Sequence, residues 1–280
     1  MLSEGEITET IQYISDRRCK SGGYCFYQLD EPNLSDTWYA LGCLMALGRI
    51  TPDPKTEAYL GQHNPAKSGF TGLYRLWYLF WSYRYLSGST PDFLIKKLQE
   101  ISPPIPRSTG TMEMASVLEQ LCFYTILCTE VGIHIPPLLR EEIHSEVLKW
   151  HHCEGGFGRS MPTLIETWHA VAIFQALNFD LCAEKIQSFL FGCLDDQTGF
   201  VNVPSSHPGY LEHLDAGVSL AILLNLPVPN PVICTDFICK CRKANGGFTR
   251  SGFGGNSTLE YTWYAIRTLS LLNGKNYWKW

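Results

Sequence analysis

One motif recurs three times along the chain, and this repetition restricts the fold more than any other feature. Each copy follows a Gly-Gly-aromatic turn and reads Leu-x-x-Thr-Trp-(Tyr/His)-Ala, as LSDTWYA at 34–40, LIETWHA at 164–170 and LEYTWYA at 259–265. The same frame identifies three weaker copies, LYRLWYL at 73–79, LEQLCFY at 118–124 and LEHLDAG at 211–217. Six related units predict a repeat architecture, in which no single unit buries its own apolar face.

The units follow one another at intervals of roughly 41 to 47 residues, and their turns begin near residues 22, 68, 109, 155, 199 and 246. We predict two helices in each unit. The first precedes the turn, as in 136–152, 183–196 and 230–243, and the second begins at the motif. Strand-type alternation is scarce. The chain is therefore predicted to be all-α, with residues 1–280 forming one domain.

About twelve helices in six pairs can form either an open solenoid or a closed ring. The second helices are more apolar and aromatic, whereas the first helices carry more charge. This asymmetry favours a closed double ring, an α6–α6 barrel, with the apolar helices inside.

Composition excludes several classes of function. Charged residues make up only 18% of the 280 residues, the net charge is -5, and no run of Lys or Arg indicates a nucleic-acid partner. No apolar stretch approaches the roughly 18 residues of a membrane-spanning helix, and the polar N-terminal segment does not resemble a signal peptide. We expect a cytoplasmic protein.

Eleven cysteines are an odd number, which does not suit a disulfide framework. Most lie within apolar helical patterns, and we predict buried free thiols, as at Cys43, Cys122, Cys128, Cys182 and Cys193. Cys239 and Cys241 form a CxC pair, which is a weak indication of a zinc or redox site.

The third position of the motif is polar or ionisable in all six copies, although the surrounding helices are apolar: Asp36, Arg75, Gln120, Glu166, His213 and Tyr261. Three residues later the chain has Tyr39, Tyr78, Phe123, His169, Ala216 and Tyr264. Residues three apart share a helix face. The pattern therefore predicts a polar rim above an aromatic belt, as in an apolar pocket with a few convergent polar groups.

Helix capping is the competing explanation for the acidic residues. Ser257 with Glu260 and Thr163 with Glu166 have capping-box spacing, and Asn33 with Asp36 is similar. Such carboxylates bind backbone N–H groups and suit the helix dipole. Tyr39 and Tyr264 are equally consistent with an ordinary core. Capping does not explain Arg75, His213 or Tyr261.

The pattern Gly-Gly-Phe-x-Arg, a short loop, then Leu-x-x-Thr-Trp-Tyr-Ala resembles the repeat shared by protein prenyltransferase β subunits and class II terpene cyclases such as squalene–hopene cyclase. Three copies match well, three are degenerate, and together they cover almost the whole chain. The resemblance implies an α6–α6 barrel whose central cavity holds an isoprenoid chain. The predicted lining is Tyr39, Tyr78, Phe123, His169 and Tyr264, with the motif tryptophans Trp38, Trp168 and Trp263.

The resemblance also allows a test for zinc. Protein prenyltransferases hold the metal with an Asp and a Cys two residues apart on one inner helix and a His on the last one. In the repeat frame these positions are His213, Asp215 and Tyr261, so the Cys and the final His are absent and zinc is not expected. The alternative is another metal bound through His213 and Asp215, and Mg²⁺ is a candidate cofactor.

Class II cyclases instead protonate an alkene or epoxide with the middle Asp of a DxDD-Thr motif. NLSDT at 33–37 keeps Asp36 but has Ser35 at the acid position, whereas TLEYT at 258–262 has Glu260 there. A carboxyl group in a desolvated pocket has a raised pKa and stays protonated until it donates. The candidate catalytic residues are Asp36, Glu166, Glu212, His213, Asp215, Glu260 and Tyr261.

Three arginines are candidates for binding a diphosphate. The family uses a basic residue near the Gly-Gly turn for this purpose, which here points to Arg159 and Arg250, and Arg75 lies on the rim. Arginine matches phosphate oxygens bidentately. The alternative is that the turn arginines bridge helices or face solvent.

These observations favour an enzyme that acts on an isoprenoid or prenyl diphosphate, with a proton-initiated cyclase reaction of the isomerase or lyase type. The alternatives are a prenyltransferase-like subunit that needs a protein partner and a non-catalytic barrel that binds a lipid or partner. An α6–α6 carbohydrate enzyme with paired carboxylates is a further alternative.

Overall fold

The computed structural model describes residues 2–27, 29–64, 72–106 and 116–275, which contain twelve α-helices and one two-stranded sheet. The turns predicted near residues 68 and 109 lie outside these ranges. The chain divides into two compact units. The first combines Met1–Lys97 with Val232–Tyr277, and the second is formed mainly by Leu98–Pro231.

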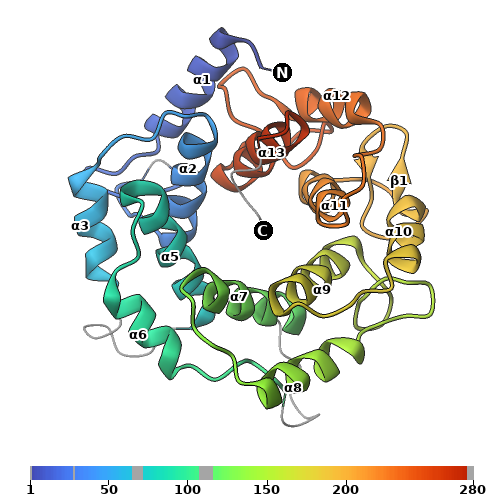
Figure 1. Cartoon of the computed structure of the whole chain (residues 1–280). Coiled ribbons are helices and arrows are strands. Elements are labelled where there is room, and N and C mark those ends of the chain that lie inside the picture. Colours follow the sequence, from blue (N-terminus) through green and yellow to red (C-terminus); the bar gives the residue numbers. More distant parts are fainter. Residues whose placement is uncertain (1, 28, 65–71, 107–115, 276–280) are drawn as a thin grey trace. The chain divides into compact units, whose positions relative to one another are not determined.

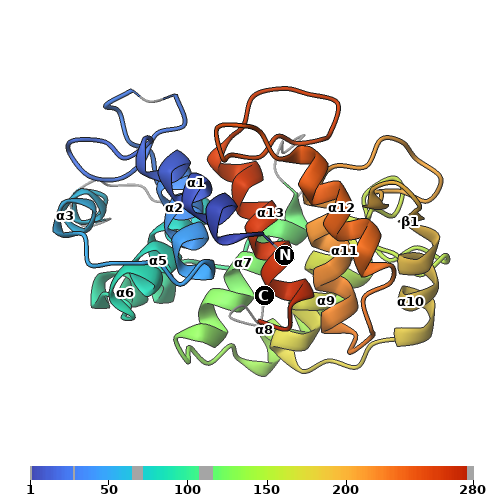
Figure 2. The same cartoon turned by 90° about the horizontal axis from the view of Figure 1, so that it is seen from above.

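The first unit contains both the first and the last helices of the chain. Its helices are α1 (Glu4–Ser15), α2 (Leu34–Ala46), α3 (Pro54–Gln62), α5 (Leu73–Ser87) and α13 (Leu259–Leu272), with α6 (Asp92–Glu100) and α12 (Pro231–Cys241) at its boundaries along the chain. α2 packs against both α5 and α13, and α3 packs against α5 (Figure 1). The α1–α2 loop and the α12–α13 loop lie at the same end of these helices (Figure 2).

The second unit repeats this arrangement. It contains α7 (Val117–Glu130), α8 (Pro137–Leu148), α9 (Leu164–Leu177), α10 (Ala183–Gly192), β1 (Leu194–Asp195), β2 (Gly199–Phe200) and α11 (Leu211–Leu223). α9 packs against α7 and α11, α8 packs on α9, and α10 packs on α11 (Figure 1).

The structure confirms the predicted helices with one correction. The motif starts α2, α9 and α13 at its first leucine, and the helices predicted over 136–152 and 230–243 are the slightly shorter α8 and α12. The helix predicted over 183–196 ends at Gly192, because residues 194–195 pair with 199–200 as an antiparallel strand. There the Asp195 carboxylate accepts hydrogen bonds from the backbone N–H groups of Gln197 and Thr198, which close the turn between the strands.

The threonine of the motif fixes each turn to the helix that follows it. Thr37, Thr167 and Thr262 are completely buried, and each hydroxyl donates to the carbonyl of the N-cap residue at 2.6 Å. Each also accepts from the backbone N–H of the turn's aromatic residue, Tyr24 at 3.0 Å, Phe157 at 2.9 Å and Phe248 at 3.2 Å. The motif threonine is therefore structural, since its hydroxyl satisfies two buried backbone groups.

The Gly-Gly pairs are required by close packing against another helix. The first glycines, Gly22, Gly155 and Gly246, all have positive φ, and a Cβ there would lie 2.2 Å from the carbonyl oxygens of Lys55, Lys185 and Glu9 respectively. The second glycines face aromatic rings four residues further along those helices, at Tyr59, Phe189 and Tyr13. Only glycine permits this approach.

The cysteine prediction holds for eight of the eleven residues, which are buried and free, whereas Cys153, Cys182 and Cys239 are exposed. Burial of Cys182 was wrong, because it lies at the N-cap of α10 rather than inside a helix. The CxC pair does not form a joint site, since Cys239 faces solvent and Cys241 is buried. Within the described ranges, no helix is long and apolar enough to cross a membrane.

Candidate functional site

Aromatic side chains cluster at the junction of α13, α2 and α5 in the first unit. The Trp38 ring lies 5.8 Å from that of Trp263, 5.4 Å from Tyr78 and 6.4 Å from Trp77, as measured between ring centroids. The Tyr39 and Tyr264 rings are 6.4 Å apart. The structure therefore brings together the predicted aromatic residues Trp38, Tyr39, Tyr78, Trp263 and Tyr264, since successive motif helices are packing neighbours.

Glu260 lies at the edge of this cluster, in the first turn of α13. The Tyr39 hydroxyl donates a hydrogen bond to Glu260 Oε1 at 3.2 Å. Burial, with the neighbouring Tyr264 and Glu260, holds the pKa of Tyr39 well above its usual range, so Tyr39 remains a hydrogen-bond donor. A carboxyl group held by a phenol among aromatic rings is suited to proton transfer.

The capping-box prediction for Ser257 and Glu260 was wrong by one residue. The N-cap of α13 is Thr258, whose hydroxyl accepts from the backbone N–H of Tyr261 at 3.0 Å. Ser257 is hydrogen-bonded to Asn245 instead. Glu260 is thus the second residue of the helix rather than the expected third, and its carboxylate accepts from Tyr39.

Asp36 takes the structural role that capping predicts. Its carboxylate accepts from the backbone N–H of Phe26 at 2.8 Å and from the side-chain amide of Asn33 at 2.6 Å. The Asn33 side chain in turn accepts from the Asp36 N–H at 2.8 Å. Asp36 therefore holds the preceding loop against the start of α2.

Arg75, at the start of α5, is fixed by the residue that ends α3. Its guanidinium lies 2.7 Å from His63 Nδ1, to which it donates. Burial and the charge of Arg75 both lower the pKa of His63, so the neutral imidazole is favoured as the acceptor. Tyr261 is half-buried in the first turn of α13.

In the second unit, Glu166 connects the starts of two helices. Its carboxylate accepts from Ser116, the N-cap of α7, at 3.3 Å and from Thr163, its own N-cap, at 3.4 Å. The Glu166 N–H donates to the Thr163 hydroxyl at 3.2 Å. Thr163 is the predicted N-cap, but the capping box is only half formed, because the Thr163 N–H donates to the Phe157 carbonyl rather than to Glu166. Gln120 lies half-buried in the first turn of α7.

The two histidines of this unit that the sequence marked as site candidates, His169 and His213, are buried. His169 is 4% exposed, and burial lowers its pKa to about 3, so its imidazole is neutral at pH 7. His213 and Asp215 are also buried in the first two turns of α11, whereas Glu212 and Phe123 are half-buried. Trp168 lies beside His169, with ring centroids 4.8 Å apart.

Arg159 and Arg250 are both exposed. A further arginine was missed by sequence reasoning, namely Arg267, which is 4% exposed on α13 one turn beyond Tyr264. Arg267 acts electrostatically on Tyr85: burial raises the pKa of Tyr85, and the charge of Arg267 opposes that rise. A single arginine inside an otherwise apolar helix was the signal that could have identified it.

Within the part of the chain that the structure describes, no three His, Cys, Asp or Glu side chains gather as they would around a metal ion. The model of the prenyltransferase alpha-alpha toroid domain matches residues 1–81 and 94–279. The chain therefore belongs to this family. Its fold class is the all-α, α6–α6 barrel that the repeat predicted.

Among solved structures, the chain is similar to a chain of Candida albicans protein geranylgeranyltransferase-I complexed with GGPP. The TM-score is 0.70 at 13% sequence identity, and the match covers 97% of this chain and 92% of the other. At this identity, the similarity shows the fold alone. Curated proteins gave no match to the sequence.

Proposed function

We propose that the chain binds an isoprenoid or prenyl diphosphate in an aromatic-lined central cavity of its toroid and starts a terpene cyclase-like reaction by proton transfer. Membership of the prenyltransferase toroid family supports a prenyl-related ligand. A structurally similar chain was solved in complex with GGPP. We also propose that residues 1–280 act as one cytoplasmic domain.

The observation that carries this proposal is the hydrogen bond from Tyr39 to Glu260 beside the aromatic cluster. When Glu260 is protonated, its carbonyl oxygen Oε1 accepts from Tyr39, and Oε2 carries the transferable proton. The alkene π electrons form a C–H bond with this proton, and the O–H electron pair returns to the carboxylate. The resulting carbocation is stabilised by aromatic faces. Loss of a proton from the cyclised cation completes an isomerisation.

The other candidate residues take supporting roles in this proposal. Asp36 and Glu166 organise turns. Tyr261 follows Glu260 in the first unit, and Glu212, His213 and Asp215 are the candidate proton donors or acceptors of the second unit. The candidate residues for binding the diphosphate are Arg75 and Arg250 in the first unit and Arg159 in the second, with Mg²⁺ as a candidate counter-ion.

A prenyltransferase-like subunit is the second candidate, and its similarity to a chain of a protein geranylgeranyltransferase favours it. In that case the carbon–oxygen bond to diphosphate breaks, and a partner protein contributes to the site. The two functions leave different products.

The test is mass spectrometry of the purified chain incubated with geranyl, farnesyl and geranylgeranyl diphosphates, with and without Mg²⁺ and EDTA. An isomeric product that keeps its diphosphate and disappears in Glu260→Gln supports the proposal. Glu57→Gln removes an exposed acid of α3 and serves as the control. Released diphosphate would favour transfer, and binding without conversion would favour a binding protein. Full activity of Glu260→Gln would exclude Glu260 as the acid.

A further inference from the structure

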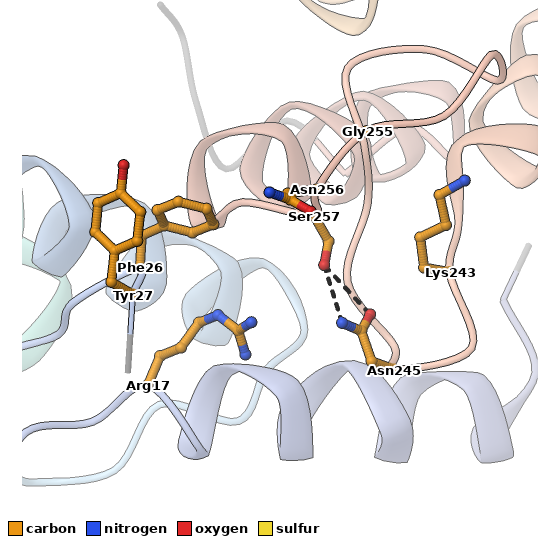
Figure 3. A pocket seen from close by; sticks show the side chains of 8 residues that line it. All are labelled: Arg17, Phe26, Tyr27, Lys243, Asn245, Gly255, Asn256 and Ser257. Carbon is orange, nitrogen blue, oxygen red and sulfur yellow. Dashed lines mark hydrogen bonds between the residues drawn. The ribbon is translucent and has the colours of Figure 1, made fainter. Parts of the chain in front are cut away.

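Two unusually long loops of the first unit enclose a pocket of about 310 Å³ (Figure 3). From the first glycine to the N-cap, the loops 22–33 and 246–258 are three and four residues longer than the equivalent loop 155–163. The pocket is lined by Arg17, Phe26, Tyr27, Lys243, Asn245, Gly255, Asn256 and Ser257. Both long loops therefore contribute residues to the pocket.

The pocket has two cationic side chains and no acidic one. Within the residues that the structure describes, neither Arg17 nor Lys243 forms an ion pair, whereas the adjacent Arg242 pairs with Glu9 and Glu6. The positive charge of the pocket is thus left for a ligand.

Arg17 is held in place before any ligand arrives. Its guanidinium stacks 3.5 Å from the centroid of the Tyr13 ring, and its Nη1 donates to the Tyr13 carbonyl at 2.9 Å. Its Nε is buried and has no hydrogen-bond partner in the described chain. Figure 3 shows the guanidinium directed toward Asn245 and Ser257. A buried donor without a partner is costly, so it indicates an absent acceptor.

The side of the pocket across from Arg17 supplies neutral hydrogen-bonding groups (Figure 3). The Asn245 side-chain NH₂ donates to the Ser257 hydroxyl at 3.0 Å, and the Asn245 side-chain oxygen Oδ1 accepts from the Gly247 N–H at 3.1 Å. These bonds fix both side chains. Phe26 and Tyr27, whose rings are 4.4 Å apart, form the apolar wall.

We propose that this pocket binds a phosphate group, either free as phosphate or diphosphate or as the head group of a lipid. Arginine and lysine beside fixed amide and hydroxyl groups are the donors that phosphate oxygens require. Tyr27, which lines the pocket, is 73% exposed, and Phe253, in the loop that supplies Gly255 and Asn256, is 83% exposed. Exposed aromatic side chains on both loops suit a lipid as the source. The site shares no residue with the proposed reaction and does not depend on it.

Isothermal titration of the full chain with inorganic phosphate and with inorganic diphosphate tests the free ligands. Co-sedimentation with phosphatidylcholine vesicles, with and without phosphatidic acid, tests the lipid source. Arg17→Gln and Lys243→Gln are each expected to weaken binding about tenfold or more, because each removes a charge-assisted contact. Lys240→Gln, which removes an exposed charge of α12 outside the pocket, is the matched control and leaves affinity unchanged.

Binding that both pocket variants weaken supports the proposal, and whichever ligand shows it identifies the source. Lys243→Gln keeps the test decisive if Arg17→Gln unfolds, since Lys243 does not pack on Tyr13. Glu260→Gln should bind as the natural chain does, which separates this site from the proposed reaction. The proposal is overturned if no ligand binds, or if binding is insensitive to Lys243→Gln.

Discussion

Gly246, in the turn before the last helix, lies directly against the backbone carbonyl of Glu9 in the first helix, where a Cβ would be 2.2 Å from the oxygen. Gly22 has this relationship with Lys55 and Gly155 has it with Lys185. Helix α1 thus packs against the last Gly-Gly turn in the same way as α3 packs against the turn at Gly22 and α10 against the turn at Gly155. The Thr10 hydroxyl reinforces this contact by donating to the Gly246 carbonyl at 2.9 Å. This pairing of first and last repeat elements is what a closed ring requires.

Gly246→Ala should lower the free energy of unfolding by at least about 3 kcal/mol, because a methyl group clashes with the α1 backbone at a positive φ. Urea unfolding measures the change. Gly254→Ala has positive φ in the same loop but open space around its Cβ, and the cost there should be only about 1–2 kcal/mol. Equal losses at the two positions would mean that the α1 contact contributes nothing.

Thr262→Val should destabilise the chain by about 1–3 kcal/mol, because it leaves the buried Phe248 N–H and Thr258 carbonyl without their hydroxyl partner. Thr262→Ser keeps the hydroxyl and loses one methyl group, so its cost should be about 1 kcal/mol. Thermal and urea unfolding of both variants give the comparison. A serine variant as unstable as the valine variant would contradict the hydrogen-bond explanation.

His169 should make stability depend on pH. Its folded-state pKa is about 3, below the value of about 6.5 in an unfolded chain. The unfolded state therefore binds more protons between these values, and stability falls as pH falls below 6.5. The loss is about 1.4 kcal/mol per pH unit, or about 2 kcal/mol at pH 5.

His169→Phe, which matches the aromatic residues at this position in other repeats, should remove that part of the slope between pH 7 and pH 5. Urea unfolding at each pH gives the curves. His134→Gln, at an exposed histidine, is the control and should keep the slope of the natural chain. An unchanged slope in His169→Phe would show that His169 does not titrate in this way.

Tyr39→Phe should lower kcat about tenfold with little change in KM, since it removes only the hydrogen bond that orients Glu260. Steady-state kinetics on the substrate found by mass spectrometry provide the measurement. Tyr83→Phe removes the hydroxyl of a buried tyrosine outside the site and should leave kcat unchanged. A KM effect alone would assign Tyr39 to binding rather than to orientation of the acid.

The local sequence patterns predicted most of the helices, but they did not predict which residues of the candidate site contact one another. Helix starts at the motif follow from periodicity and capping, so α2, α9 and α13 begin where expected. The cap of α13 was misplaced by one residue, because Ser257 and Thr258 are both good N-caps and only their surroundings choose between them. Glu260 and Tyr39 are 221 residues apart in the chain, and their hydrogen bond depends on the packing of α13 against α2.

The sequence by itself determined the repeat and the helices, because these depend on residue spacing and backbone geometry within one repeat. Only the tertiary structure decided that Gly246 packs against Glu9, that Tyr39 donates to Glu260, and that two long loops form a pocket with Arg17 and Lys243. These relationships join segments distant in the chain, and their strength comes from burial and close packing, which no local pattern encodes.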